Sequence, residues 1–304
     1  MRTIVTAGAK GADIDVFACA IAYAELLRLE GKDAIPVIAG TFTMSVTPSI
    51  LEWGATYEKD HVSESTDSYV LVDISDPKHV PSFVDLEKVT EVYDHRFGHE
   101  DFWKQNINLN SHIEMVGACG TLIWEEFKKR GKQSEITVPS AKLLLASIVS
   151  NTLNFRGPIT TDRDLVAYSE LKEITGLNEE WVSAYFLEQE DILLKDFKNY
   201  LKADTKLFKM PFGEFVIAQI ELWDASTIIK TKTTEINDVM QEHASLPWIL
   251  NAPNISNGFN YIYSTNKEGK RIIEEKLNIK FIGDIAKTDR LMMRKEIMKI
   301  LLAS

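Results

Sequence analysis

The sequence has few of the features of a secreted or membrane-bound protein. Its 304 residues include only two cysteines, Cys19 and Cys119, which are too few for the disulfide framework of a small extracellular domain. No run of about 18 or more apolar residues is present to span a bilayer, and residues 1–5 show no signal-peptide pattern. We therefore expect a reduced, cytoplasmic location and no membrane partner.

Positive charge is also scarce. The chain carries 34 Lys and Arg residues against 45 Asp and Glu residues, for a formal net charge of -11. This excess of negative charge disfavours a general electrostatic attraction to long nucleic acid or to anionic lipid. A local basic pocket for a small anion remains compatible with it.

The chain is long enough for two domains, and its hydrophobic content of 45% can fill a core in each. Residues 188–200 are charged and contain neither Gly nor Pro, which predicts a helical connector rather than a flexible linker. We expect one domain over residues 1–188 and a smaller one over residues 189–304.

Short apolar segments alternate with helical segments in the first domain. This alternation is typical of an α/β fold with a mostly parallel sheet and crossover helices. The second domain has fewer such segments and is predicted to be a mixed α/β module. The expected strands are residues 4–7, 34–39, 69–72 and 89–93 in the first domain and 214–222, 259–264 and 279–282 in the second, with helices over residues 16–29 and 267–277.

Acidic residues follow the ends of several predicted strands. Asp13, Asp73 and Asp94 each lie just beyond such an end, and the carboxyl ends of parallel strands meet at one edge of a sheet. Three carboxylates are therefore expected to converge there, of which Asp13 and Asp73 are candidate ligands for a hard cation, whereas Asp94 is expected to orient His95 or to cap the backbone locally. Alone, Asp13 and Asp15 could equally be a helix N-cap and a first-turn acid.

In this order, the motifs resemble those of the DHH phosphoesterase superfamily, most closely its manganese-dependent (family II) inorganic pyrophosphatases and prune-like exopolyphosphatases. The first motif lies over residues 9–15, where both aspartates match and Ala9 replaces a histidine. Asp73 matches the second motif. The third is Asp94-His95-Arg96, in which arginine replaces the second histidine, and Asn151 stands where the family has a metal-bridging aspartate.

The resemblance implies a metal site with altered ligands. Asp15, Asp73 and His95 would still supply three ligands to one Mn²⁺ or Mg²⁺ ion. A second ion, near Asp13, would bind weakly or arrive with substrate, because the imidazole at Ala9 and a charge at Asn151 are missing. Asn151 would be either a neutral ligand or a structural amide at a helix end.

The resemblance extends to the substrate-closing module of the family, and so implies an active site in the cleft between two domains. Residues 196–200 match an Asp-x-Lys-x-aromatic element that contains Lys198. Arg294 and Lys295 match the cationic pair of a second element. These three cations would bind substrate phosphate, with Lys198 also stabilising charge in the reaction. The alternative for Arg294 and Lys295 is a solvated helix face.

Arg96 changes the expected chemistry, because arginine does not release a proton near neutral pH. Its planar fork instead suits a clamp on phosphate, so Arg96 is predicted to act in both catalysis and substrate binding. His99 could replace the missing proton donor if its loop turns back on the site. Otherwise it is a solvated loop histidine.

These expectations favour a metal-dependent phosphohydrolase in which a metal-activated water attacks a small phosphoanhydride or phosphoester. Pyrophosphate is the default substrate. The alternatives are a hydrolase of a different small phosphate, or a catalytically impaired sensor that binds phosphate or a nucleotide. A homodimer would be in keeping with the family resemblance.

Overall fold

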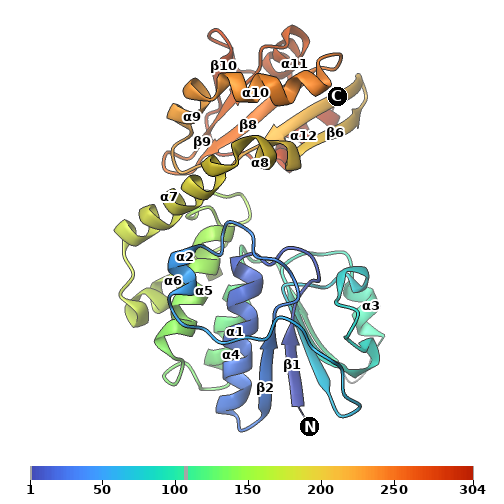
Figure 1. Cartoon of the computed structure of the whole chain (residues 1–304), viewed down its shortest axis with the longest axis vertical. Helices are drawn as coiled ribbons and strands as arrows, with labels where there is room; N and C mark the ends of the chain where they lie inside the picture. The colour runs from blue at the N-terminus through green and yellow to red at the C-terminus, as the bar shows by residue number, and fades with distance from the viewer. Residues whose placement is uncertain (1, 106–108, 304) are drawn as a thin grey trace. The chain divides into compact units, whose positions relative to one another are not determined.

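The computed structural model describes residues 2–105 and 109–303 (Figure 1). Its contacts divide the chain into two compact units. Unit 1 comprises Met1–Phe155 and Ile159–Val182, and unit 2 comprises Arg156–Pro158 and Ser183–Ser304. The functional domain limits given above, 1–188 and 189–304, stay a prediction.

Unit 1 is built on a five-stranded, fully parallel sheet with the order β2-β1-β3-β4-β5. The predicted parallel α/β fold is confirmed, and each of its four predicted strands is present. The fifth strand was not predicted, because its sequence NSHI is polar and only partly buried. The strands are β1 Arg2–Thr6, β2 Asp33–Val37, β3 Ser68–Val72, β4 Val89–Asp94 and β5 Asn110–Ile113.

Helices cover both faces of this sheet (Figure 1). Helix α1 is buried from Ile14 to Leu27, because it packs against the sheet and also against α4 and α5. On the other face, Trp103 of α3 joins a core cluster with Ile4 and Tyr69. The helices of unit 1 are α1 Ile14–Leu29, α2 Pro48–Leu51, η1 Pro77–His79, η2 Leu86–Lys88, α3 Glu100–Lys104, α4 Cys119–Lys129, α5 Val138–Asn151 and α6 Asp162–Thr175, and α7 Glu179–Lys195 begins in unit 1 and continues in unit 2.

A left-handed turn follows α5. Leu153, Asn154 and Phe155 have φ angles of 51°, 50° and 61°, a conformation that costs an ordinary L-residue about 1–2 kcal/mol. Two hydrogen bonds hold the turn, from the Asn154 N–H to the Val149 carbonyl and from the Phe155 N–H to the Thr152 hydroxyl. The Phe155 ring also packs edge-on against Tyr168. These contacts offset the backbone strain.

Unit 2 contains a mixed five-stranded sheet with the order β10-β9-β8-β7-β6, in which β7 and β8 are parallel and the other pairs antiparallel. The predicted mixed α/β module is confirmed. The strand predicted at 279–282 is wrong: only Ile282 forms a bridge there, and the strand follows the turn at Gly283. The elements are α8 Phe197–Ala203, β6 Thr205–Met210, β7 Gly213–Gln219, α9 Ala225–Thr231, α10 Thr233–Met240, η3 Gln241–His243, β8 Trp248–Asn254, β9 Phe259–Tyr263, α11 Lys267–Leu277, β10 Ile285–Lys287 and α12 Arg294–Leu302.

A network of neutral amides lies in the core of unit 2. Asn260 donates to the side-chain oxygen of Asn251 and to the Met292 carbonyl, and accepts from the Met292 N–H. Asn251 in turn donates to Gln219, whose side-chain oxygen also accepts from the Arg294 N–H. The network fixes the segment that leads into α12.

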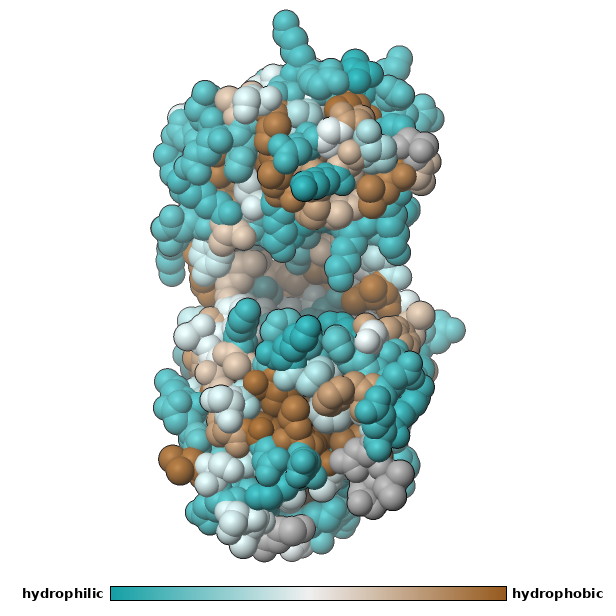
Figure 2. Space-filling model, turned by 90° about the vertical axis from the view of Figure 1, so that its right-hand side faces the viewer, coloured by the Kyte–Doolittle hydropathy of each residue, from teal (hydrophilic) through white to brown (hydrophobic). Residues whose placement is uncertain are grey.

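The surface in view in Figure 2 is mostly hydrophilic, with hydrophobic residues interrupting it in patches. Within the described residues, no helix has both the length and the apolar character needed to cross a bilayer. Cys19 and Cys119 are both buried and form no disulfide.

Candidate metal centre

The first turn of α1 carries two of the predicted ligands. Asp13 is the N-cap of the helix, and its carboxylate accepts a hydrogen bond of 3.0 Å from the Val16 N–H. The helix therefore begins two residues before the predicted start at residue 16. Burial, followed by the nearby charge of Asp15, raises the pKa of Asp13. Asp15 lies inside the helix and has no exposed surface.

Asp15 accepts a full set of hydrogen bonds. Its Oδ1 accepts from the Gly120 N–H at 2.9 Å and from the Ser147 hydroxyl at 2.7 Å. Its Oδ2 accepts from the Cys119 N–H at 2.8 Å and from the Asn151 amide at 2.5 Å. These donors stabilise the charged carboxylate and fix its orientation.

Asp73 differs from Asp15 because no well-oriented hydrogen bond reaches its buried Oδ1 from the described residues, and its counter-ion is Arg96, whose Nη2 lies 2.6 Å from that oxygen. Asp73 follows β3 with a φ of 52°, and its N–H donates to the Tyr93 carbonyl at 2.8 Å. Burial and the charge of Asp15 raise the pKa of Asp73 well above its ordinary value, although Arg96 opposes this. A divalent cation would give this oxygen a second positive partner.

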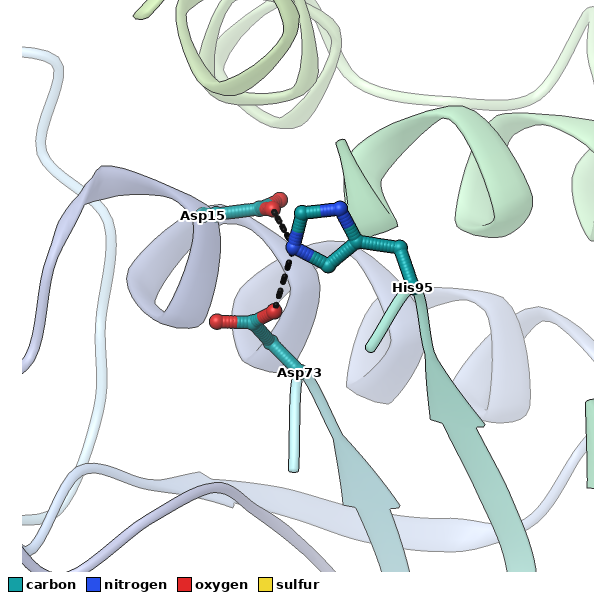
Figure 3. Close-up of side chains that lie close together, drawn as sticks. All are labelled: Asp15, Asp73 and His95. Atoms are coloured by element: carbon teal, nitrogen blue, oxygen red, sulfur yellow. Dashed lines mark ion pairs between the residues drawn. The ribbon is translucent and has the colours of Figure 1, made fainter. Parts of the chain in front are cut away.

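His95 presents one ring nitrogen to these two carboxylates (Figure 3). Its Nδ1 lies 3.1 Å from the Val116 carbonyl, and because a carbonyl only accepts, Nδ1 is the donor. Nε2 then points at the acids, 3.5 Å from Asp73 Oδ1 and 3.9 Å from Asp15 Oδ2. A backbone carbonyl that orients an imidazole in this way is the usual arrangement for a metal-binding histidine.

Asp15, Asp73 and His95 form the one group of at least three potential metal-binding side chains found in residues 2–105 and 109–303, with their ligand atoms all within 4.8 Å of one another. Two carboxylate oxygens and one imidazole nitrogen suit a divalent cation such as Mn²⁺. The donor set, together with the mutual repulsion of the buried carboxylates of Asp15 and Asp73, fits the predicted metal.

Arg96 lies beside this group. Its Nε donates to Asp94 Oδ1 at 3.1 Å, and its Nη2 donates to the Asp73 carbonyl and lies 2.6 Å from Asp73 Oδ1. Burial tends to lower the pKa of Arg96, but the charges of Asp73 and Asp94 outweigh it and raise the pKa. Arg96 is thus a permanent cation whose side chain remains half-exposed.

Other predicted residues of unit 1 lie at the edge of the group or outside it. Asn151 donates its amide N–H to Asp15, so it orients a carboxylate of the group. His99 precedes α3, and its Nε2 lies 3.6 Å from Asp76 Oδ2. The structure therefore pairs His99 with Asp76 rather than with the acids of the group.

The three predicted phosphate-binding cations lie in unit 2. Lys198 forms an exposed ion pair of 2.7 Å with Asp238. Arg294 is largely buried and donates to the side chain and the carbonyl of Asp204. Lys295 follows it in the first turn of α12 and is exposed. Their role in phosphate binding stays a prediction.

The sequence did not identify all the groups that hold the centre. Ser147 and Asn151 are four residues apart on α5 and both donate to Asp15. Their spacing places them on one helix face, and this was the available signal. The N–H groups at the start of a helix can bind phosphate, but those of Cys119 and Gly120 at the start of α4 donate to Asp15.

Comparison with known proteins identifies relatives over most of the chain, although no family model matches it. A probable manganese-dependent inorganic pyrophosphatase of Bacillus licheniformis is 30% identical over 236 residues, which are 76% of this chain and 75% of that protein. A protein of the same description from Shouchella clausii is 29% identical over 255 residues, 83% of this chain and 77% of that protein.

Solved structures share the fold. The putative family II inorganic pyrophosphatase of Methanococcus jannaschii aligns over 99% of this chain and 98% of its own, with a TM-score of 0.65 and 22% identity. An exopolyphosphatase-related protein from Bacteroides fragilis aligns over 98% of this chain and 90% of its own, with a TM-score of 0.54 and 13% identity. Both similarities extend over the two units of the chain.

Proposed function

This chain belongs to the family of manganese-dependent inorganic pyrophosphatases, and we propose that it is a metal-dependent hydrolase of small phosphate compounds, with pyrophosphate as the first substrate to test. The predicted family resemblance is thereby confirmed, as is the hydrolase class, since the relatives are named for cleaving a phosphoanhydride. The substrate of this chain is the part that we propose.

One observation carries the proposal: the buried carboxylates of Asp73 and Asp15 lie close together beside Nε2 of His95, and Asp73 Oδ1 has only the half-exposed guanidinium of Arg96 as a counter-ion. Two buried carboxylates repel each other, and a divalent cation held by both would remove that cost. When bound, such a cation lowers the pKa of a water molecule and neutralises phosphate charge. Asp15, Asp73 and His95 would hold it.

We propose Mn²⁺ as the natural ion, with Mg²⁺ as the alternative, in one firm site. The relatives are named for manganese. Any second ion would bind near Asp13 only weakly or together with substrate, because Ala9 supplies no ligand and the guanidinium of Arg96 already pairs with Asp73. Asn151 supports the first site by orienting Asp15.

Arg96 is the residue we assign to substrate in unit 1. Its guanidinium is held by Asp73 and Asp94, yet its side chain remains 54% exposed, so it can present N–H groups to a phosphate oxygen. Since it keeps its proton, it stabilises charge and does not act as an acid. His99 remains the proposed proton donor, supported only by its place in the same loop.

Lys198, Arg294 and Lys295 remain proposed phosphate ligands. The ion pair between Lys198 and Asp238 is exposed, and such pairs stabilise a protein by about 0–1 kcal/mol, so Lys198 can exchange this partner for phosphate. Arg294 would have to loosen its bonds to Asp204. The predicted cytoplasmic location and homodimer also remain proposals.

The deciding experiment measures metal content and phosphate release on one preparation. Protein purified without chelator is analysed for bound metal, then assayed with pyrophosphate, tripolyphosphate, nucleotides and sugar phosphates in Mn²⁺ or Mg²⁺. We expect one Mn²⁺ per chain and release from pyrophosphate above that from the other substrates. If metal is bound but phosphate is released faster from another compound, that compound replaces pyrophosphate as the proposed substrate. If no compound releases phosphate, the proposed hydrolase function is refuted.

A second function has one observation in its favour, because Arg96 and Asn151 occupy positions where the family has a histidine and an aspartate. A protein with these replacements could bind phosphate or a nucleotide without cleaving it. Asp73→Asn distinguishes the two functions. A hydrolase would lose Mn²⁺ binding and turnover, whereas a metal-free sensor would keep or gain ligand affinity because an anion near the phosphate is removed.

A further inference from the structure

Asp164 is a second fully buried carboxylate near the metal centre, and no cation contacts it within the described residues. It lies in the first turn of α6 with no exposed surface. Its Oδ2 accepts from the Gly117 N–H at 2.8 Å, the Thr161 N–H at 2.8 Å and the Thr161 hydroxyl at 2.7 Å. Its Oδ1 accepts from the Thr121 hydroxyl at 2.6 Å. Four hydrogen bonds therefore replace a counter-ion.

Two of these bonds reach the turn before α4. Gly117 and Thr121 lie at opposite ends of the segment 117–121, so Asp164 ties down both ends of the segment at once. The contact is too close for a larger residue at Gly117, where an added Cβ would lie 2.8 Å from Asp164 Oδ2 and 2.6 Å from the Thr152 side chain. The position of this turn is thus set by Asp164.

The same turn orients two of the three metal-binding side chains. The Val116 carbonyl accepts the hydrogen bond from Nδ1 of His95 and so directs Nε2 toward the acids. The N–H groups of Cys119 and Gly120 bind the two oxygens of Asp15. A shift of the turn would therefore misalign both His95 and Asp15.

We propose that Asp164 is a positioning residue for the metal centre, acting on Asp15 and His95 through residues 116–120. This inference rests on the proposed metal function but makes its own claim about geometry. Partners that orient metal ligands from outside the ligand shell typically change metal affinity by about 10–100-fold when they are removed. Asp164 contacts neither Asp15 nor His95 directly, and acts on them through the hydrogen bonds that residues 116–120 make to both.

A purely structural role is the alternative, because Asp164 also completes the capping box of α6 with Thr161. Asp67 provides the matched control. It too is a buried carboxylate of unit 1, it accepts from the Glu64 N–H and pairs with His61, and it makes none of the hydrogen bonds described for the turn or the metal centre. Asp67→Ala should destabilise the fold without disturbing Asp15 or His95.

The test compares the wild type with Asp164→Ala, Asp164→Asn and Asp67→Ala, using Mn²⁺ titrations followed by electron paramagnetic resonance and thermal unfolding of the metal-free proteins. We expect Asp164→Ala to weaken Mn²⁺ binding about 10–100-fold. Asp164→Asn should keep most of the affinity, because its oxygen can still accept from Gly117 and its amide can donate to the Thr121 hydroxyl. Asp67→Ala should keep wild-type affinity in the folded fraction.

Thr121→Val is the milder variant if Asp164→Ala does not fold, since it removes one hydroxyl donor to Asp164 without changing the shape of the side chain. Amide hydrogen exchange of Cys119 and Gly120 in the metal-free proteins gives a readout that needs no ion. Faster exchange in the Asp164 or Thr121 variants than in Asp67→Ala supports the proposal. Equal exchange and unchanged Mn²⁺ affinity would overturn it. A wild type that binds no Mn²⁺ refutes the metal function instead, and the exchange data then decide on the positioning role.

Discussion

In unit 1 the metal centre is built around buried carboxylates, whereas in the core of unit 2 the buried polar network consists of neutral amides. Asn251, Asn260 and Gln219 exchange hydrogen bonds with one another and with the backbone of Met292. Asp15 and Asp73 repel each other, and the guanidinium of Arg96 is the one cation paired with Asp73 among the described residues. The amide network satisfies its own hydrogen bonds, whereas the carboxylates keep an excess of negative charge.

The difference separates a polar group that stabilises the fold from one that serves binding. Amides carry both donors and acceptors, so a few of them can satisfy each other in a dry core. Ionised carboxylates only accept, so a group of them needs an external cation. Two buried carboxylates that share too little positive charge are therefore a better sign of a cation site than burial alone.

Asp73→Asn would test this contrast most severely. Asparagine keeps the shape of the side chain and tolerates a positive φ, but it removes the charge of the buried carboxylate. Loss of a residue that only orients a metal ligand lowers metal affinity by up to about 100-fold. We expect Asp73→Asn to lower Mn²⁺ affinity by more than this and to abolish turnover. Isothermal titration with Mn²⁺ measures this, and Asp76→Asn in the same loop is the control. Wild-type Mn²⁺ affinity in Asp73→Asn would exclude the site.

Asn260→Ala addresses the other side of the comparison. It leaves the Met292 N–H and the Asn251 oxygen without this partner, whereas the Met292 carbonyl still accepts from Asn251, and each unsatisfied buried group costs about 1–3 kcal/mol. We expect the free energy of unfolding of unit 2 to fall by at least about 2 kcal/mol, with Mn²⁺ affinity unchanged. Urea unfolding measures the loss, against Asn257→Ala at an exposed position of unit 2. A loss equal to that of Asn257→Ala would mean that the network is not stabilising.

Arg96→Gln would show how much of the negative charge of the metal centre is already neutralised by the guanidinium of Arg96. Two unit charges about 5 Å apart interact by about 3 kcal/mol at an effective dielectric constant of about 20, and solvent reduces this for a half-exposed side chain. We expect Mn²⁺ to bind roughly tenfold more tightly, equivalent to about 1.4 kcal/mol, while phosphate release slows. Lys104→Gln removes a positive charge elsewhere in unit 1 and should change neither quantity. Weaker Mn²⁺ binding in Arg96→Gln would show that Arg96 supports the ion.

The smallest expected effect is a dependence of stability on pH in the metal-free protein. Burial raises the pKa of Asp73 and Asp13 in the folded state, so the folded chain binds more protons than the unfolded chain above the ordinary aspartate pKa of about 3.9. Stability should therefore fall as the pH rises from about 4 toward the raised values. Asp73→Asn should make this fall shallower. Chemical unfolding at several pH values, without metal, measures it, and equal slopes in both proteins would contradict the raised pKa of Asp73.

The sequence predicted the strands whose buried side chains are almost all apolar. The first four strands of unit 1 read as apolar runs because parallel strands are covered on both faces. Strand β8 was missed because its sequence WILNAPN places Asn251 and Pro253 in a buried segment. The burial of Asn251 depends on Gln219, 32 residues away, and a local pattern does not contain that partner.

The same limit applies to the metal centre. Asp15, Asp73 and His95 were predicted because they follow strands or match a family motif. Asp164 and Ser147 were not, since their partners Gly117 and Asp15 are 47 and 132 residues away in the chain. His99 was predicted to act as a proton donor only if its loop turns back on the centre, and its Nε2 lies 3.6 Å from Asp76 Oδ2, so its role stays a prediction.

The left-handed turn of Leu153, Asn154 and Phe155 places three residues with side chains in a conformation that glycine adopts most easily. Glycine would adopt these angles at little steric cost, whereas Leu153 and Phe155 each forgo about 1–2 kcal/mol and Asn154 forgoes less, because asparagine tolerates this conformation. Glycine at Asn154 would relieve part of this strain but would also enlarge the conformational freedom of the unfolded chain. The hydrogen bonds of the turn and the contact of Phe155 with Tyr168 therefore fix the direction of the chain after α5. The left-handed conformation itself does not stabilise the fold.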